Sequence, residues 1–126
     1  MNTHAINWFE IPVSDFNRAK AFYEAIFQYQ MPENTMGPAR MGFLLYDFQN
    51  GGRGGAIVHN PDFYTPSANG SLVYLNCDPD LQIILDRVEK AGGKVNMVKT
   101  EVGPGLGFWA LIIDTEGNRV ALHSMK

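Results

Sequence analysis

The two halves of this chain repeat one pattern of secondary-structure signals at a nearly constant separation. Leu72 follows Trp8 at the same separation at which His123 follows His59, and the segments between them align with the same order of signals. A unit of this size is too small to be stable alone and leaves one sheet face bare. The repeat therefore predicts two copies of one unit, packed so that each completes the other.

Each half begins with a strand that leads into an amphipathic helix. Residues 6–13 alternate between two faces, as expected for a strand, and Asp15 can cap the helix that follows. Apolar residues then recur at helical spacing in both halves. These residues are Ala19, Phe22, Tyr23 and Ile26 in the first half, and Leu81, Ile84, Leu85 and Val88 in the second.

Three further strands follow each helix. In the first half we expect strands over residues 42–48 and 55–59, joined by a hairpin turn in the glycine-rich segment NGGRGG. In the second half the segments KVNMV, FWALIID and RVALHS alternate with turn signals. The predicted fold is one α+β domain over residues 1–126. It contains two βαβββ repeats, at about 5–61 and 70–125, whose sheets curve together around a shared cleft.

Composition excludes several classes of protein. Ten Lys and Arg residues against thirteen Asp and Glu leave no basic surplus, so we expect no nucleic-acid partner. The chain shows neither a signal-peptide pattern nor an apolar run long enough to span a bilayer, so a cytoplasmic protein without a membrane partner is predicted. The single cysteine, Cys77, excludes an internal disulfide and a cysteine-cluster zinc site.

The strand face that points away from the helices is the candidate ligand site. On this face we place Trp8, Glu10, Leu72, Tyr74, Asn76 and Phe108, and we place Trp109 against a helix. Glu10 beside an aromatic wall suits a general base or a ligand anchor, and its alternative is a structural carboxylate paired with Arg119. Tyr74 and Asn76 would orient a small-molecule ligand through hydrogen bonds.

Two histidines occupy matching places in the repeats. His59 and His123 could contact a ligand at the rim of the cleft, or form a displaced metal site with Glu10, since two imidazoles and a carboxylate suit zinc, iron or manganese. Both also lie at strand ends, where surface histidines are common. We predict no cofactor, with a divalent metal ion as the alternative.

The opening segment INWFEIPVSDFNRAKAFYEAIF and the closing segment DTEGNRVALHS resemble the vicinal oxygen chelate superfamily. This superfamily holds glyoxalase I, bleomycin-resistance proteins and extradiol dioxygenases, and the likeness extends over essentially the whole chain. The resemblance implies the paired βαβββ fold, a homodimer and a small-molecule ligand.

In the metal-dependent enzymes of that superfamily, four ligands come from the concave sheet face. Carried over by the resemblance, these positions are Trp8, Ile57, Leu72 and Ala121, and none has a metal-binding side chain. The first hypothesis is therefore a binding protein of the bleomycin-resistance type. The second is a divergent lyase, isomerase or dioxygenase-like enzyme, using displaced metal ligands or Glu10 as a base. The third is a scaffold whose cleft has collapsed.

Overall fold

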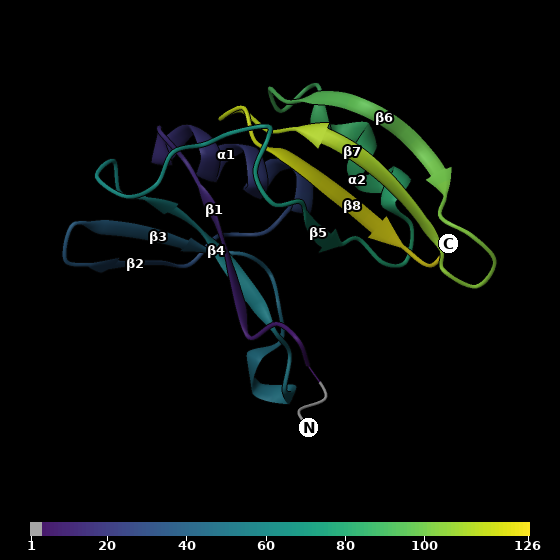
Figure 1. Cartoon of the computed structure of the whole chain (residues 1–126), viewed down its shortest axis with the longest axis horizontal. Helices are drawn as coiled ribbons and strands as arrows, with labels where there is room; N and C mark the ends of the chain where they lie inside the picture. Colours follow the sequence, from purple (N-terminus) through teal and green to yellow (C-terminus); the bar gives the residue numbers. More distant parts are fainter. Residues whose placement is uncertain (1–3) are drawn as a thin grey trace.

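The computed structural model describes residues 4–126, and its two halves repeat the same order of elements (Figure 1). The first half contains β1 (Trp8–Pro12), α1 (Phe16–Phe27), β2 (Glu33–Met36), β3 (Ala39–Phe43), the short 3-10 helix η1 (Phe48–Asn50) and β4 (Gly54–His59). The second half contains β5 (Val73–Asn76), α2 (Leu81–Val88), β6 (Lys94–Glu101), β7 (Phe108–Ile113) and β8 (Arg119–Ser124). The predicted α+β fold of two βαβββ units is confirmed.

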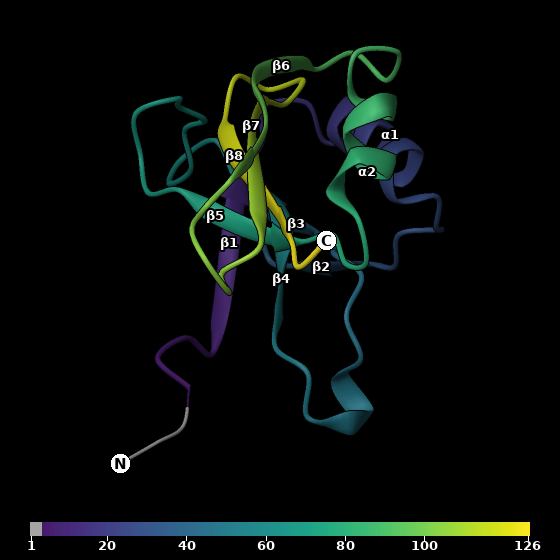
Figure 2. The same ribbon diagram turned by 90° about the vertical axis from the view of Figure 1, so that its right-hand side faces the viewer.

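Each half forms its own four-stranded mixed sheet. The strand orders are β1-β4-β3-β2 and β5-β8-β7-β6, with the first and last strands of each half running parallel. Figure 2 shows both helices on one side of the strands. The sheets therefore have a helix face and an open face, and β1 and β5 are edge strands. Among residues 4–126, no helix is long and apolar enough to cross a membrane.

Aspartate caps begin both helices. The carboxylate of Asp15 accepts a hydrogen bond from the backbone N–H of Arg18 at 3.0 Å, and that of Asp80 accepts one from Gln82 at 2.9 Å. Such caps satisfy N–H groups that have no partner within the helix. Helix α1 ends at Gln28, whose φ of 53° is left-handed.

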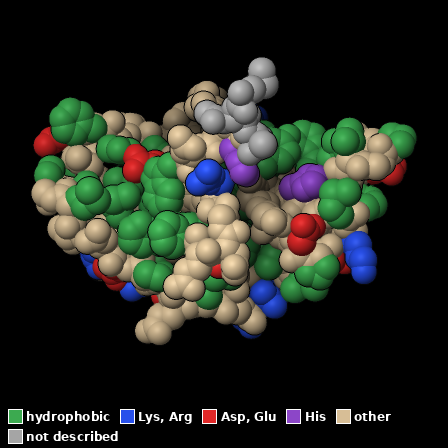
Figure 3. All heavy atoms as spheres, turned by 90° about the horizontal axis from the view of Figure 1, so that it is seen from below, with side chains coloured by type: hydrophobic (Ala, Val, Ile, Leu, Met, Phe, Trp, Pro, Cys, Tyr) green, Lys and Arg blue, Asp and Glu red, His purple; other side chains and the backbone are tan. Residues whose placement is uncertain are grey.

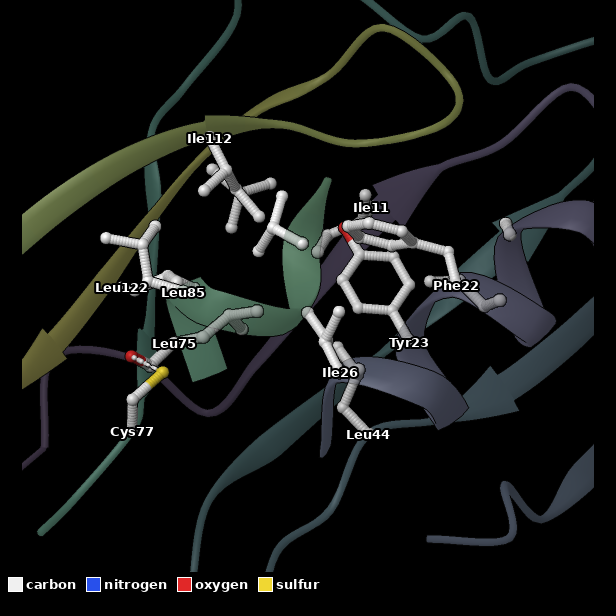
Figure 4. Packing of buried hydrophobic residues seen from close by; sticks show 14 of the residues in the cluster. Ile11, Phe22, Tyr23, Ile26, Leu44, Leu75, Cys77, Leu85, Ile112 and Leu122 are labelled. Atoms are coloured by element: carbon white, nitrogen blue, oxygen red, sulfur yellow. Dashed lines mark hydrogen bonds between the residues drawn. The ribbon is translucent and has the colours of Figure 1, made fainter. Parts of the chain in front are cut away.

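One hydrophobic core joins the two halves. Phe22, Tyr23 and Ile26 of α1 are essentially inaccessible to solvent, and they belong to the same buried cluster as Leu85 of α2 and Ile112 of β7. Figure 4 shows side chains of both halves within this cluster. Full burial of a large apolar side chain contributes roughly 1.5–3 kcal/mol. The repeats therefore share their main source of stability.

The β7–β8 turn (residues 114–118) ties the second half to the first. Tyr23 donates a buried hydrogen bond to the carboxylate of Asp114 at 2.7 Å. The side-chain amide of Asn118 donates to the backbone carbonyl of Pro12 at the end of β1, also at 2.7 Å. The closing motif of the sequence thus works as a clamp between repeats, which we call the interrepeat turn.

Glu116 completes this clamp at the start of α1. Its carboxylate accepts hydrogen bonds from the backbone N–H groups of Ser14 (3.1 Å) and Asp15 (2.7 Å), and from the guanidinium of Arg18 (2.8 Å). Burial alone would raise the pKa of Glu116, but these hydrogen bonds and one from Thr115 outweigh burial and hold it at about 2. Glu116 therefore stays ionised down to strongly acidic pH.

The predicted match of His59 with His123 is wrong by one residue. Pro12 and Asn76 are equivalent in β1 and β5, and their partners on the last strands are Val58 and His123. His59 therefore corresponds to Ser124 and not to His123. The second half has one residue more between its first strand and its helix N-cap, positions 76 to 80 against 12 to 15.

The strand predicted over residues 42–48 also differs from the structure. Strand β3 ends at Phe43, and the chain then runs through the β3–β4 loop (residues 44–53), in which Asp47 caps η1. Gly54 and Gly55 lie inside β4 and not in a turn. A Cβ at Gly55 would stand 2.3 Å from the carbonyl oxygen of Phe9, so the close approach of β1 requires this glycine.

Candidate functional site

Cavities at the seam between the repeats take side chains from both halves, and two of them are described first. The first, of about 220 Å³, is here called the polar cavity. It is lined by Glu10, Ile11, Pro12, Thr65, Ser67, Gly70, Ser71, Val73, Asn118, Arg119 and Val120. The second, of about 450 Å³, is here called the apolar groove. It is lined by Ile6, Phe9, Arg53, Gly54, Ser71, Leu72, Val73 and Tyr74.

Glu10 and Arg119 line the polar cavity from opposite repeats. The Glu10 carboxylate accepts a hydrogen bond from the hydroxyl of Tyr64 at 2.5 Å and a longer one from Trp8 Nε1 at 3.4 Å. The hydrogen bond to Glu10 raises the pKa of Tyr64. Within residues 4–126, Glu10 makes no ion pair with Arg119, so the predicted structural pairing is not formed. Both charged groups are left facing one cavity.

Trp8 belongs to an aromatic group on the open face of the first sheet. Its ring meets the rings of Phe43 and Tyr46 edge to face, with centroids 6.0 and 5.9 Å apart. This geometry favours contact between the positive edge of one ring and the negative face of another. A Cβ at Gly54 would stand 2.2 Å from the Tyr46 ring, so the glycine makes room for that ring against β4.

Tyr74 lines the apolar groove. The residue is 52% exposed, and its ring stacks on that of Trp109 of β7, with centroids 5.9 Å apart and planes 8° from parallel. It also lines a cavity of about 160 Å³ that shares Phe9, Arg53 and Gly54 with the groove. The groove therefore continues past Tyr74 toward the β3–β4 loop.

The second repeat tests which strand faces were predicted correctly. Leu75 and Cys77 lie in the core, so Leu72, Tyr74 and Asn76 alternate onto the open face, as predicted. Leu72 lines the apolar groove, and Asn76 lines the cavity beyond Tyr74.

The predicted faces of Phe108 and Trp109 are wrong. Phe108 packs against the main core beside the buried Ala110 and Ile112, and Trp109 stacks on Tyr74. The apolar run of β7 is hydrophobic on both faces, so its sequence carried no alternation from which the correct phase could be chosen.

The two histidines point to opposite sides of their sheets. His123 lies on the open face, where its Nε2 donates to the carbonyl oxygen of Leu106 at 2.8 Å, and it lines a shallow cavity with Tyr74 and Asn76. His59 alternates with Val58 and shares the helix side with the buried Ile57. The displaced metal set of Glu10, His59 and His123 is therefore not assembled. In the part of the chain that the structure describes, no three His, Cys, Asp or Glu side chains gather where they could hold a metal ion.

The model of the Glyoxalase/Bleomycin resistance protein/Dioxygenase superfamily matches residues 5–122. The chain belongs to this superfamily. A glyoxylase-like domain-containing protein from Didymella fabae is 31% identical over 123 residues, covering 93% of this chain and 91% of the relative. This finding confirms the resemblance drawn from the opening and closing motifs.

Solved structures agree on the fold. A hypothetical protein from S. aureus has a TM-score of 0.69 at 19% identity, covering 98% of this chain and 95% of its own. A glyoxalase/bleomycin resistance protein from Albidiferax ferrireducens has a TM-score of 0.69 at 14% identity, covering 98% of this chain and 100% of its own. At these identities the likeness extends to the fold alone.

The superfamily's metal-ligand positions can be compared with the structure. Trp8, Leu72 and Ala121 lie on open faces, but Ile57 is buried on the helix face of its sheet. In the strand registers Ala56 faces Glu10 as Ala121 faces Tyr74, so Ala56 is the position that corresponds to Ala121. None of these side chains offers a carboxylate, imidazole or thiolate, so the residues present do not fit a divalent metal ion.

Sequence reasoning missed three residues of the seam. Arg53 was treated as part of a hairpin turn, Tyr64 as part of a linker, and Tyr46 as part of a strand. The position of Arg53 among four glycines could have indicated a role outside the turn, because a turn is formed by the glycine backbone and does not require a guanidinium. No pattern in the sequence indicated that Tyr64 would reach Glu10.

Proposed function

We propose that this protein binds a small, largely apolar molecule at the seam between its repeats. One observation carries the proposal: the apolar groove is built by side chains of both halves, with Phe9 on one side and Leu72 and Tyr74 on the other. Its volume of about 450 Å³ lies within the ordinary range for small-molecule sites, roughly 300–1,000 Å³. A site made of two repeats exists only when the whole chain is folded.

The superfamily's ligand positions support binding rather than metal-assisted chemistry. Trp8, Ala56, Leu72 and Ala121 together present an indole and three aliphatic groups. We infer that hydrocarbon has replaced the coordinating groups at these places, so that the open faces suit apolar contact. The parallel with bleomycin-resistance proteins, which the superfamily includes, points the same way.

Titration with the neutral fluorophore N-phenyl-1-naphthylamine tests this proposal, because its emission rises in apolar surroundings. We expect saturable binding to the wild-type chain and an affinity about tenfold lower for Tyr74→Ala, since a stacked aromatic wall is worth about 1.4 kcal/mol. Val98→Ala, which removes an exposed apolar side chain of β6, is the matched control and should leave binding unchanged. Non-saturable emission, or equal affinity for Tyr74→Ala, would reject the proposal.

We also propose that the protein is a cytoplasmic homodimer. The open face of the first sheet carries Trp8, which lies outside the apolar groove and is 37% exposed, and a second copy that packs on this face would cover it. Sedimentation velocity on the full chain should give the mass of two 14.0 kDa chains. A single species at the monomer mass would reject the dimer.

A metal-free enzyme is the second candidate, favoured by one observation. Glu10 and Arg119 face the same cavity without forming an ion pair, which is an arrangement suited to removing a proton beside a carbonyl held by the guanidinium. In this case Glu10→Gln should abolish turnover of any substrate found, while Glu33→Gln, which alters a carboxylate at the distant edge strand, should not. Unchanged turnover in Glu10→Gln would remove Glu10 from the chemistry.

A further inference from the structure

We propose that the ligand of the apolar groove carries an anionic group, such as a carboxylate, and that Arg53 binds it. The inference rests on the proposed function and names the chemical class of its ligand. The groove and its extension beyond Tyr74 are otherwise apolar or uncharged, and Arg53 is the charged side chain in both linings. A buried aromatic or aliphatic body with one anionic end matches this distribution of groups.

Among the residues that the structure describes, none forms an ion pair with Arg53. Three other arginines are engaged: Arg18 with Glu116, Arg40 with Glu33, and Arg87 with the backbone carbonyl of Ile26. Within residues 4–126, Arg53 makes no hydrogen bond or ion pair, and no carboxylate lines the groove or its extension. A planar guanidinium with free donors is suited to bidentate binding of a carboxylate.

The backbone around Arg53 is fixed although its side chain is free. Gly52 donates its N–H to the carbonyl oxygen of Asp47 at 2.8 Å, and a Cβ at Gly52 would stand 2.4 Å from that oxygen. On the other side, Gly54 packs under the ring of Tyr46. These contacts therefore hold the backbone on both sides of Arg53 in place, which lowers the backbone entropy lost when a ligand binds.

The surface near the β3–β4 loop is largely apolar, so a single cation there can determine which ligands bind. Figure 3 shows hydrophobic side chains gathered in a broad patch on the face of the molecule seen from below. Leu45 and Phe48 of the loop are 67% and 75% exposed. An apolar surface attracts apolar molecules without selecting among them, because the hydrophobic effect has no direction. Arg53 supplies the charge that selects anionic ones.

A matched pair of probes tests the inference: 8-anilinonaphthalene-1-sulfonate, and N-phenyl-1-naphthylamine, which lacks the sulfonate. We expect Arg53→Gln to weaken binding of the sulfonate about tenfold, as loss of a charge-assisted contact implies, and to leave the neutral probe unchanged. Lys94→Gln removes an exposed positive charge from the start of β6, which lines neither the groove nor its extension, and serves as the control, with both affinities unchanged.

Each outcome separates this inference from the proposed function. Saturable binding of the neutral probe, with equal sulfonate affinity in the wild type and Arg53→Gln, would overturn the role of Arg53 and leave the groove intact. Failure of both probes to bind the wild type would overturn the proposed function itself. Added salt should weaken the sulfonate and not the neutral probe, because Arg53 is exposed and its charge is screened. Equal urea midpoints for the three chains would show that all are folded.

Discussion

The two repeats share a topology but use the connection before their last strand for different purposes. In the second repeat, the interrepeat turn connects β7 and β8 in residues 114–118 and binds the first repeat through Asp114, Glu116 and Asn118. In the first repeat, the β3–β4 loop occupies residues 44–53 and supplies Arg53 and Tyr46 to the seam cavities. The first of these connections holds the repeats together, and the second lines the proposed site.

Of these substitutions, Asp114→Ala should cause the largest loss of stability. The Asp114 carboxylate accepts hydrogen bonds from the Tyr23 hydroxyl and from the backbone N–H groups of Glu116 and Asn118, and its loss leaves buried donors without partners. We expect the free energy of unfolding to fall by about 3 kcal/mol, measured by urea denaturation.

The control lies at the matching connection of the first repeat. Asp47 also holds its own turn but is exposed, so Asp47→Ala should cost about 0.5–1 kcal/mol, the range of a helix cap. Equal losses in the two variants would contradict the division of tasks between the connections.

Glycine-to-alanine substitutions in the two repeats should also differ in how much stability they cost. Gly55→Ala places a Cβ against the backbone of β1, so we expect a loss of about 2 kcal/mol from overpacking. Gly117→Ala, in the interrepeat turn, meets open space but sits at a φ of +88°, and should cost about 1 kcal/mol through backbone strain. A larger loss for Gly117→Ala would show that space between β1 and β4 is not limiting.

Acid should loosen the clamp between the repeats. The pKa of Glu116 is about 2 in the folded chain against an ordinary value of 4.5, so the unfolded chain binds more protons between these values. The stability that Glu116 provides is therefore complete above about pH 4.5 and is lost as the pH falls toward 2. We expect Glu116→Gln to be less stable than the wild type at pH 7 by about 1.5 kcal/mol.

This gap should close on acidification, which urea midpoints at several pH values would reveal. Glu33→Gln is the comparison, because Lys20 and Arg40 lower the pKa of Glu33 on an exposed edge strand. A gap for Glu116→Gln that stays constant down to pH 2 would mean that ionisation of Glu116 does not hold the clamp.

The smallest change in stability is expected when a core residue of one repeat is replaced by the residue at the equivalent position of the other. Cys77 follows β5 as Val13 follows β1, and both are buried. Cys77→Val should change the free energy of unfolding by less than about 1 kcal/mol, because the volumes are close. Burial raises the pKa of the Cys77 thiol to about 12, so a thiol reagent should not modify the folded wild type at neutral pH. Rapid modification would contradict this burial.

The sequence predicted what depends on clear local signals. Strand β8 matches the predicted segment RVALHS, the helices fall where apolar spacing placed them, and the open face of Tyr74 follows from strict alternation. The phase of Phe108 and Trp109 was lost because β7 is apolar throughout. The equivalence of His59 and His123 failed because two similar endings, AIVHN and VALHS, favoured an alignment that ignored the additional residue before α2.

The candidate site was harder to predict, because its parts come together only through tertiary contacts. Glu10, Leu72 and Tyr74 were found from strand faces, but Arg53 and Tyr64 come from connections whose course no periodicity describes. A loop residue is positioned by contacts of the backbone on either side of it, such as the contact of Gly52 with Asp47. No periodic pattern of residues in the sequence predicts such contacts.

The clamp made by residues 114–118 has a consequence for the order in which a ribosome delivers this protein. Helix α1 emerges early, yet the Glu116 carboxylate that binds the N–H group of Asp15 at its start comes 101 positions later along the chain. Core residues that pack against α1, such as Ile112 and Leu122, also come late in the chain. The N-terminal half must wait, exposed, until residues 114–118 have been translated. Nascent chains halted before Asp114 should therefore be digested readily by proteases, and those extended past Ser124 should resist them.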